Sequence, residues 1–141
     1  MLKGLFFLEK PMNHKHIIKS LPLLASVLGH KYGVQVRIGG DNAFTNGNVI
    51  QLPSLPLDCG ETLISLVRGL IDHESAHICD TDFDALRAAN LTPLEKHIWN
   101  TIEDWRAENV LSAVYPGCRE NFQWLIKHFF LPKLTKRRRK E

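Results

Sequence analysis

The sequence predicts an α+β fold, because apolar residues recur with helical spacing in long stretches and alternate with polar residues in one short region. The strand-like runs lie together between residues 34 and 52, and helical patterns precede and follow them. An Asn-Gly pair separates two of the runs, as is typical of a tight hairpin. We therefore expect a small antiparallel β-sheet or hairpin packed on the helix that follows it, with further helices toward the C-terminus.

The first helix is expected over residues 13–30, where apolar side chains recur every three to four positions. Pro22 lies within this stretch and is expected to kink or divide the helix, because proline cannot donate a backbone hydrogen bond. Residues 34–38 alternate and predict a strand. Two further strands are expected at residues 43–45 and 48–52, on either side of the Asn46-Gly47 turn.

A loop with two prolines, residues 53–60, separates the strands from a helix expected over residues 61–79. A short helix follows at residues 84–90. Thr92 and Glu95, with a proline between them, form a capping signal for a long helix that ends near residue 114. The last apolar stretch predicts a helix at residues 120–130.

Composition indicates one globular domain, with 44% hydrophobic and 23% charged residues in a chain of 141. The apolar run near the N-terminus is interrupted before a signal-peptide core develops, and no stretch reaches the length of a membrane span. Three cysteines without Cys-x-x-Cys spacing argue against a disulfide framework and a thiolate zinc site. We expect a cytoplasmic protein without membrane association, with one domain over residues 1–131.

Residues 132–141 form a strongly basic segment, since six of the last nine residues are lysine or arginine. Such a run can contact nucleic acid or an acidic partner. No aromatic residues are interleaved with the charges, so we favour a solvated, disordered tail or the start of a linker over a nucleic-acid interface.

The stretch from His73 to His77 has the pattern His-Glu-x-x-His. Residues four apart share one helix face, so both imidazoles can reach a single Zn²⁺ while Glu74 faces a metal-bound water. Zinc in hydrolases usually has three protein ligands and one open position. The sequence thus predicts a zinc hydrolase with Glu74 as general base, and a third ligand remains to be found.

The segment 100–108 supplies the candidates for the third ligand. A ligand six residues after His77 is disfavoured, because Phe83 occupies that position. Glu103 and Asp104 are adjacent, hence about 100° apart on a helix, and only one can point straight at the metal. We favour Glu103, with Asp104 or Asn100 orienting a ligand imidazole. Asp104 remains the alternative ligand, and Asp82 would close the site if it bound as a fourth.

Four pieces of the sequence resemble the gluzincin-type, metallopeptidase-like domain of CobT-like proteins that also carry a von Willebrand A domain. They cover residues 42–47, 73–77, 81–83 and 100–108, and their ordered combination is more specific than any one piece. The resemblance implies a zincin-like α+β fold, a zinc ion with Glu103 as third ligand, and a bacterial or phage protein. It also implies a MoxR-type AAA+ ATPase as partner. Relatives continue into a linker and an A domain.

Two functions follow as expectations. The first is a zinc metallopeptidase that hydrolyses a peptide or protein substrate, with Arg106, His97 or Tyr115 as donor to the oxyanion. An extended substrate would then add to the free edge of the hairpin. The second is a zinc-stabilised, non-catalytic module that docks an AAA+ ATPase.

Overall fold

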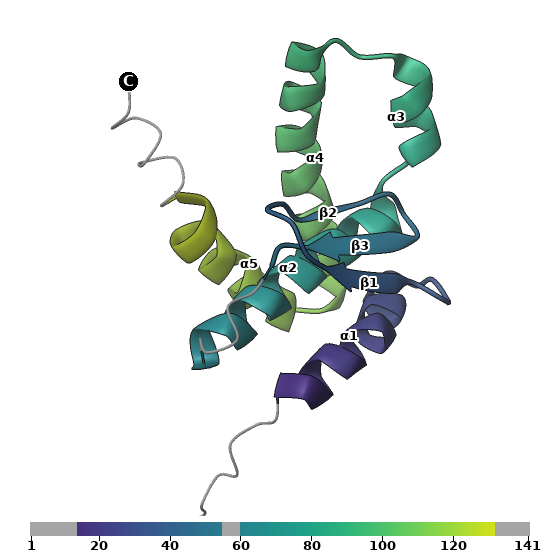
Figure 1. Ribbon diagram of the computed structural model, residues 1–141. Coiled ribbons are helices and arrows are strands. Elements are labelled where there is room, and N and C mark those ends of the chain that lie inside the picture. Colours follow the sequence, from purple (N-terminus) through teal and green to yellow (C-terminus); the bar gives the residue numbers. More distant parts are fainter. Residues whose placement is uncertain (1–13, 55–59, 132–141) are drawn as a thin grey trace, which may run out of the picture.

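The computed structural model describes residues 14–54 and 60–131, which form an α+β arrangement of five α-helices and a three-stranded mixed sheet (Figure 1). The basic segment 132–141, with the tail or linker expected there, lies outside the described residues. The elements in chain order are α1 (His14–Leu28), β1 (Gln35–Ile38), β2 (Phe44–Thr45), β3 (Val49–Leu52), α2 (Gly60–Asp80), α3 (Phe83–Ala89), α4 (Pro93–Val114) and α5 (Gly117–Leu125), followed by a π-helical turn (Ile126–Phe130).

Helix α1 continues through Pro22, so the expected division of this helix does not occur. Leu21 and Ala25, on either side of the proline, are almost completely buried in the main core. Burial of this apolar face stabilises the helix and outweighs the loss of one backbone hydrogen bond at Pro22.

The sheet has the strand order β1-β3-β2 and is mixed, whereas a purely antiparallel sheet was expected. Strands β2 and β3 form the predicted antiparallel hairpin, but β1 pairs with β3 in parallel. Strand β3 is central and is hydrogen-bonded on both edges, to β1 and to β2. Its Ile50 and Leu52 side chains are fully buried, so this strand also packs on the core. The chain after β1 therefore crosses to the far side of β3 before it enters β2.

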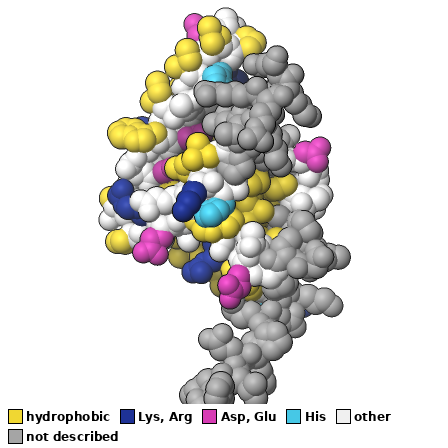
Figure 2. Space-filling view, turned by 90° about the vertical axis from the view of Figure 1, so that its left-hand side faces the viewer, with side chains coloured by type: hydrophobic (Ala, Val, Ile, Leu, Met, Phe, Trp, Pro, Cys, Tyr) yellow, Lys and Arg dark blue, Asp and Glu magenta, His cyan; other side chains and the backbone are white. Residues whose placement is uncertain are grey.

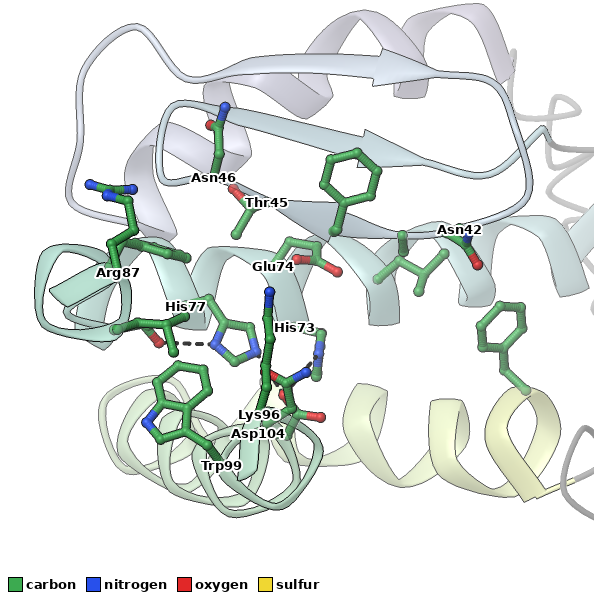
Figure 3. A pocket seen from close by; sticks show the side chains of 18 residues that line it. Asn42, Thr45, Asn46, His73, Glu74, His77, Arg87, Lys96, Trp99 and Asp104 are labelled. Carbon is green, nitrogen blue, oxygen red and sulfur yellow. Dashed lines mark hydrogen bonds and ion pairs between the residues drawn. The ribbon is translucent and has the colours of Figure 1, made fainter. Parts of the chain in front are cut away.

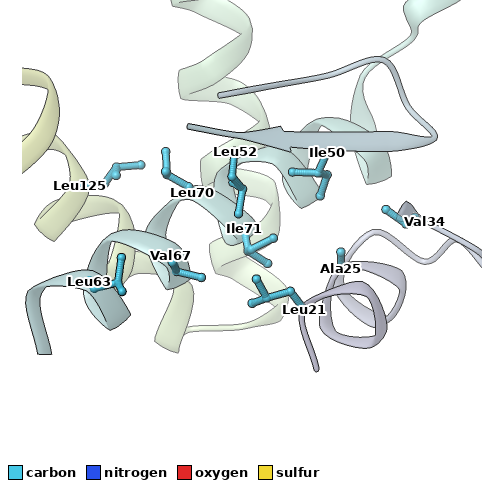
Figure 4. Packing of buried hydrophobic residues seen from close by; sticks show 10 residues of the cluster. All are labelled: Leu21, Ala25, Val34, Ile50, Leu52, Leu63, Val67, Leu70, Ile71 and Leu125. Carbon is cyan, nitrogen blue, oxygen red and sulfur yellow. The ribbon is translucent and has the colours of Figure 1, made fainter. Parts of the chain in front are cut away.

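Helix α2 passes through the middle of the molecule, and every residue from Gly69 to Ala76 is buried. Helices α1, α4 and α5 and strands β2 and β3 all contact it. Its apolar residues form the main core with those of α1, β3 and α5 (Figure 4). Gly69 permits the close approach of α5, because a Cβ atom there would lie 3.2 Å from the Asn121 carbonyl oxygen.

Helix α4 begins with the predicted capping box, which is confirmed. The Thr92 side chain accepts a hydrogen bond from the Glu95 backbone N–H, and the Glu95 carboxylate accepts one from the Thr92 backbone N–H. The buried residues of α4 all lie between Glu103 and Ser112, and α3 has none. Consequently α3 and the first half of α4 extend beyond the sheet and α2 (Figure 1).

The last helix begins at Gly117, three residues earlier than expected, because only Tyr115 and Pro116 separate it from α4. It continues into the π-helical turn, whose Phe129 packs against the main core. No helix among the described residues is long and apolar enough to span a membrane.

Candidate metal centre

The two histidines of the motif lie one turn apart on α2. His73 is buried and His77 is half-buried, and the centroids of their rings are 4.9 Å apart. Both side chains point from α2 toward α4 and meet at the edge of the same pocket (Figure 3). The helical spacing thus brings the imidazoles together, as the sequence predicts.

A carboxylate from α4 meets both imidazoles, and it belongs to Asp104. Asp104 Oδ1 lies 3.0 Å from His77 Nε2 and 3.8 Å from His73 Nε2. One ligand atom from each of these three side chains lies within 4.8 Å of the others. This group could hold a metal ion.

Glu103, the favoured third ligand in the sequence analysis, is placed differently. Its carboxylate accepts two hydrogen bonds from Arg106, from Nε at 2.8 Å and from Nη2 at 2.7 Å, and one from Thr81 Oγ1 at 2.7 Å. The reason is the rotation of α4 about its axis. Ala107 and Leu111 are buried and lie between Glu103 and Asp104 around the helix, so Asp104 falls on the side of the imidazoles and Glu103 on the side of Thr81, at the end of α2.

The contacts of Glu103 determine which nitrogen of His77 carries the proton. Arg106 lowers the pKa of Glu103, so this carboxylate is ionised and can only accept. The Thr81 hydroxyl donates its one proton to Glu103, and therefore accepts from His77 Nδ1, which lies 2.9 Å away. The lone pair of His77 Nε2 is then directed toward Asp104, as metal coordination requires.

His73 is oriented in a similar way by Glu108. Its Nδ1 lies 2.8 Å from Glu108 Oε1, so the ring donates to the carboxylate through Nδ1 and directs Nε2 toward the group. Burial lowers the pKa of His73, but the hydrogen bond to Glu108 and the charges of Glu74 and Asp104 raise it overall.

Thr81 and Glu108 are the two orienting residues to which the sequence analysis assigned no role. Each stands four positions after a residue of the candidate group, Thr81 after His77 and Glu108 after Asp104. This helical spacing was the signal that could have identified them.

Glu74 is buried and lines the pocket next to the candidate metal group. Burial raises the pKa of Glu74, and the imidazoles of His73 and His77 oppose this effect, while Asp104 adds to it. The net shift of the Glu74 pKa is upward.

The pocket has a volume of about 560 Å³ and lies between the sheet edge, α2 and the extended part of α4. Its wall includes the two residues of β2, the basic side chains of Arg87 and Lys96, and the indole of Trp99 (Figure 3). Arg87 forms an ion pair with Asp84 on α3. An elongated ligand could thus lie along β2 with the candidate metal group beneath it.

The remaining residues singled out in the sequence are not part of the group formed by His73, His77 and Asp104. Asn100 lines the pocket. Asp82 caps α3 by accepting from the Ala85 backbone N–H, and it is not part of the metal-binding group found among the described residues.

The three candidate oxyanion donors do not line this pocket. Arg106 is bonded to Glu103 and the Asp80 carbonyl, the Tyr115 hydroxyl lies 3.3 Å from His30 Nε2, and His97 is exposed on α4.

The chain is thus an α+β protein in which a histidine pair on one helix and an aspartate on a second helix form a candidate metal-binding site. Residues 17–138 match the family described as cobalamin biosynthesis protein CobT, and the chain therefore belongs to this family. The CobT-like part of the resemblance is thereby confirmed. No curated protein and no solved structure matches the chain.

Proposed function

We propose that this chain is a zinc-dependent, metallopeptidase-like hydrolase with a zincin-like site. The observation that carries the proposal is the placement of the buried Glu74 carboxylate beside the group of His73, His77 and Asp104, in one open pocket. A metal that only stabilises a fold is usually enclosed by four protein ligands, whereas a catalytic metal has three and an accessible position. The described residues offer three.

The donor set suits Zn²⁺, because two imidazole nitrogens and one carboxylate oxygen are ligands that zinc commonly takes in hydrolases. Hydrogen bonds at Nδ1 of both rings direct both Nε2 atoms toward Asp104. When bound, zinc would polarise the substrate carbonyl and make a water molecule more acidic. In this proposal Asp104 replaces Glu103 as the third ligand.

Glu74 would act as the general base that accepts the proton of the attacking water. Its burial keeps bulk water away from the carboxylate, and its position on α2 between the two histidines holds it beside the metal group. Lys96 is the basic pocket residue that stands on the first half of α4, and its ammonium would stabilise negative charge that develops on the substrate oxygen.

The substrate class follows from the edge of the sheet. Strand β2 pairs with β3 on one side only, and Phe44, Thr45 and Asn46 from its end line the pocket. An extended peptide can therefore add to the open side of β2 through backbone hydrogen bonds, with little dependence on side-chain identity. We propose peptides or unfolded protein segments as substrates.

The test combines metal analysis with a peptide-cleavage assay. Protein purified without added zinc should contain close to one equivalent of metal, and Glu74→Gln should retain it while cleavage of a fluorogenic peptide library falls by about 10²–10⁴-fold. Glu61→Gln, at the exposed start of the same helix, is the matched control and should leave cleavage unchanged. Unchanged cleavage by Glu74→Gln would remove Glu74 from the role of base.

A second candidate function is a zinc-stabilised module that docks an AAA+ ATPase. The observation that favours it is the extension formed by α3 and the first half of α4, which buries none of its residues and is available to a partner. In this case the chain would bind one equivalent of zinc, resist thermal unfolding in its presence, and cleave no peptide. A MoxR-type ATPase would bind the wild-type chain.

A further inference from the structure

Arg87 is a charged residue of the pocket that the proposed mechanism does not use. It stands on α3 and lines the end of the pocket on the same side as Asn46 (Figure 3). Asn42 lies toward the opposite end, and the candidate metal group lies between the two ends. The pocket thus has one end with a positive charge that lies beyond the metal group.

The turn that follows β2 packs against the start of α3. A Cβ atom at Gly47 would lie 3.3 Å from Phe83 Cδ2, and both Asn46 and Phe83 line the pocket. Strand β2 therefore runs toward α3 along the pocket, and its last residues lie on the side of Arg87. A ligand that follows this strand must pass the Arg87 end.

The pocket offers Arg87 no acid at its own end. Among the described residues, the acids that line the pocket are Glu74 and Asp104, and both lie at the candidate metal centre. A bound divalent metal ion would offset their two charges. Lys96 adds a second positive charge to the pocket wall, so the pocket is then net positive.

The acids of α3 and the start of α4 lie outside the pocket. Asp84 forms an ion pair with Arg87, but 92% of its side chain is exposed, and ion pairs in contact with water are weak. Asp84 accepts from Nη2 alone, so other donors of the guanidinium remain for a ligand. Asp82 and Glu95 accept hydrogen bonds from backbone N–H groups at the starts of α3 and α4.

The first half of α4 has two different sides. Its outer side carries exposed hydrophobic residues, and Figure 2 shows such side chains following one another along the upper part of the molecule. Its pocket side carries Lys96, Trp99 and Asn100. The pocket side suits a glutamate or aspartate side chain, because the indole can pack against methylene groups while the basic residues attract the carboxylate.

We propose that Arg87 selects peptides with an acidic side chain on the N-terminal side of the cleaved bond, an inference that rests on the proposed function. A peptide that adds to the free edge of β2 pairs more stably when it runs antiparallel to the strand. Its N-terminal part then lies at the Asn46 end, where Arg87 can bind a carboxylate through two parallel hydrogen bonds. Asn42 and Leu70, toward the opposite end, carry no charge.

The first experiment sequences the products that the zinc-loaded full chain releases from a peptide library, and then compares matched peptides. A Glu at the selected N-terminal position should give a kcat/KM about 3- to 10-fold above that of the Lys peptide, and high salt should reduce this preference. Arg87→Glu should reverse the preference. Arg119→Glu, at an exposed position on α5 outside the pocket, is the matched control and should retain it.

The second experiment separates this inference from the proposed function. Fluorescence anisotropy measures the binding of labelled Glu and Lys peptides to zinc-loaded Glu74→Gln, with and without Arg87→Glu. The Glu peptide should bind about 3- to 10-fold more tightly, and only when Arg87 is present.

The outcomes differ for the two proposals. Cleavage without an acidic preference, a preference that Arg87→Glu leaves unchanged, or a preference on the C-terminal side would overturn the inference and leave the peptidase function intact. Absence of cleavage together with tighter binding of the Glu peptide would overturn the peptidase function and support the selectivity of Arg87. Absence of both cleavage and binding would overturn both.

Discussion

At the scale of single residues, the roles of two adjacent acids on α4 can be separated. Asp104→Ala removes one of three metal ligands in our proposal and should weaken zinc affinity by more than about 100-fold. Glu103→Gln removes no ligand but disturbs the ion pair with Arg106 and the hydrogen bond that orients His77 through Thr81, so the loss should be about 10-fold to 100-fold. Competition with a chromophoric chelator measures both. A larger loss in Glu103→Gln than in Asp104→Ala would return Glu103 to the position of ligand.

The buried thiol of Cys118 should make the protein less stable at alkaline pH. Burial raises the pKa of this thiol to about 12, and the Asp72 carboxylate adds to the shift. The native state keeps the proton while the unfolded chain loses it above about pH 8.5. The contribution is therefore fully present below that pH and is lost as the pH rises toward the native pKa, by up to about 1.4 kcal/mol per pH unit.

Urea unfolding at pH 8 and at pH 10 measures this effect. The wild-type chain should lose more stability between these two values than Cys118→Ala, in which the group is missing. Equal losses in both proteins would show that the thiol does not take part in the alkaline destabilisation.

At the scale of elements, the N-terminus of α4 depends on its capping box. Thr92→Ala leaves the Glu95 backbone N–H without its side-chain partner and should lower the free energy of unfolding by about 1 kcal/mol. Thr101→Ala, at an exposed position inside the same helix, should leave stability unchanged or raise it slightly, because alanine has the higher helix propensity. Urea unfolding curves distinguish the two, and similar effects would mean that the cap does not stabilise α4.

At the scale of the whole molecule, the packing of α1 against α2 depends on Gly29. A Cβ atom there would lie 2.7 Å from Ile78 Cγ2 and 2.9 Å from the Ala25 carbonyl oxygen. Gly29→Ala should therefore destabilise the protein by about 1–3 kcal/mol, since the two helices must move apart. Gly117→Ala meets no atom within 4 Å and should be neutral or stabilising. A scan of thermal unfolding that ranks the two variants alike would contradict this packing.

The sequence by itself determined those features that depend on residues close together in the chain. Examples are the histidine pair of α2, whose four-residue spacing places both rings on one helix face, and the capping box of α4. The Asn46-Gly47 hairpin is another, because its two strands are joined by the turn that aligns them.

Only the tertiary structure decided how these local units meet. The parallel pairing of β1 with β3 depends on which strand takes the central position and is hydrogen-bonded on both edges. The alternation of apolar and polar residues within one strand carries no such information. Glu103 was the ligand favoured from the sequence, but Asp104 is also a carboxylate and differs from it by about 100° in direction, which the sequence alone does not fix. The packing of Ala107 and Leu111 sets the rotation of α4, and that rotation brings Asp104 to the histidines and Glu103 to Thr81.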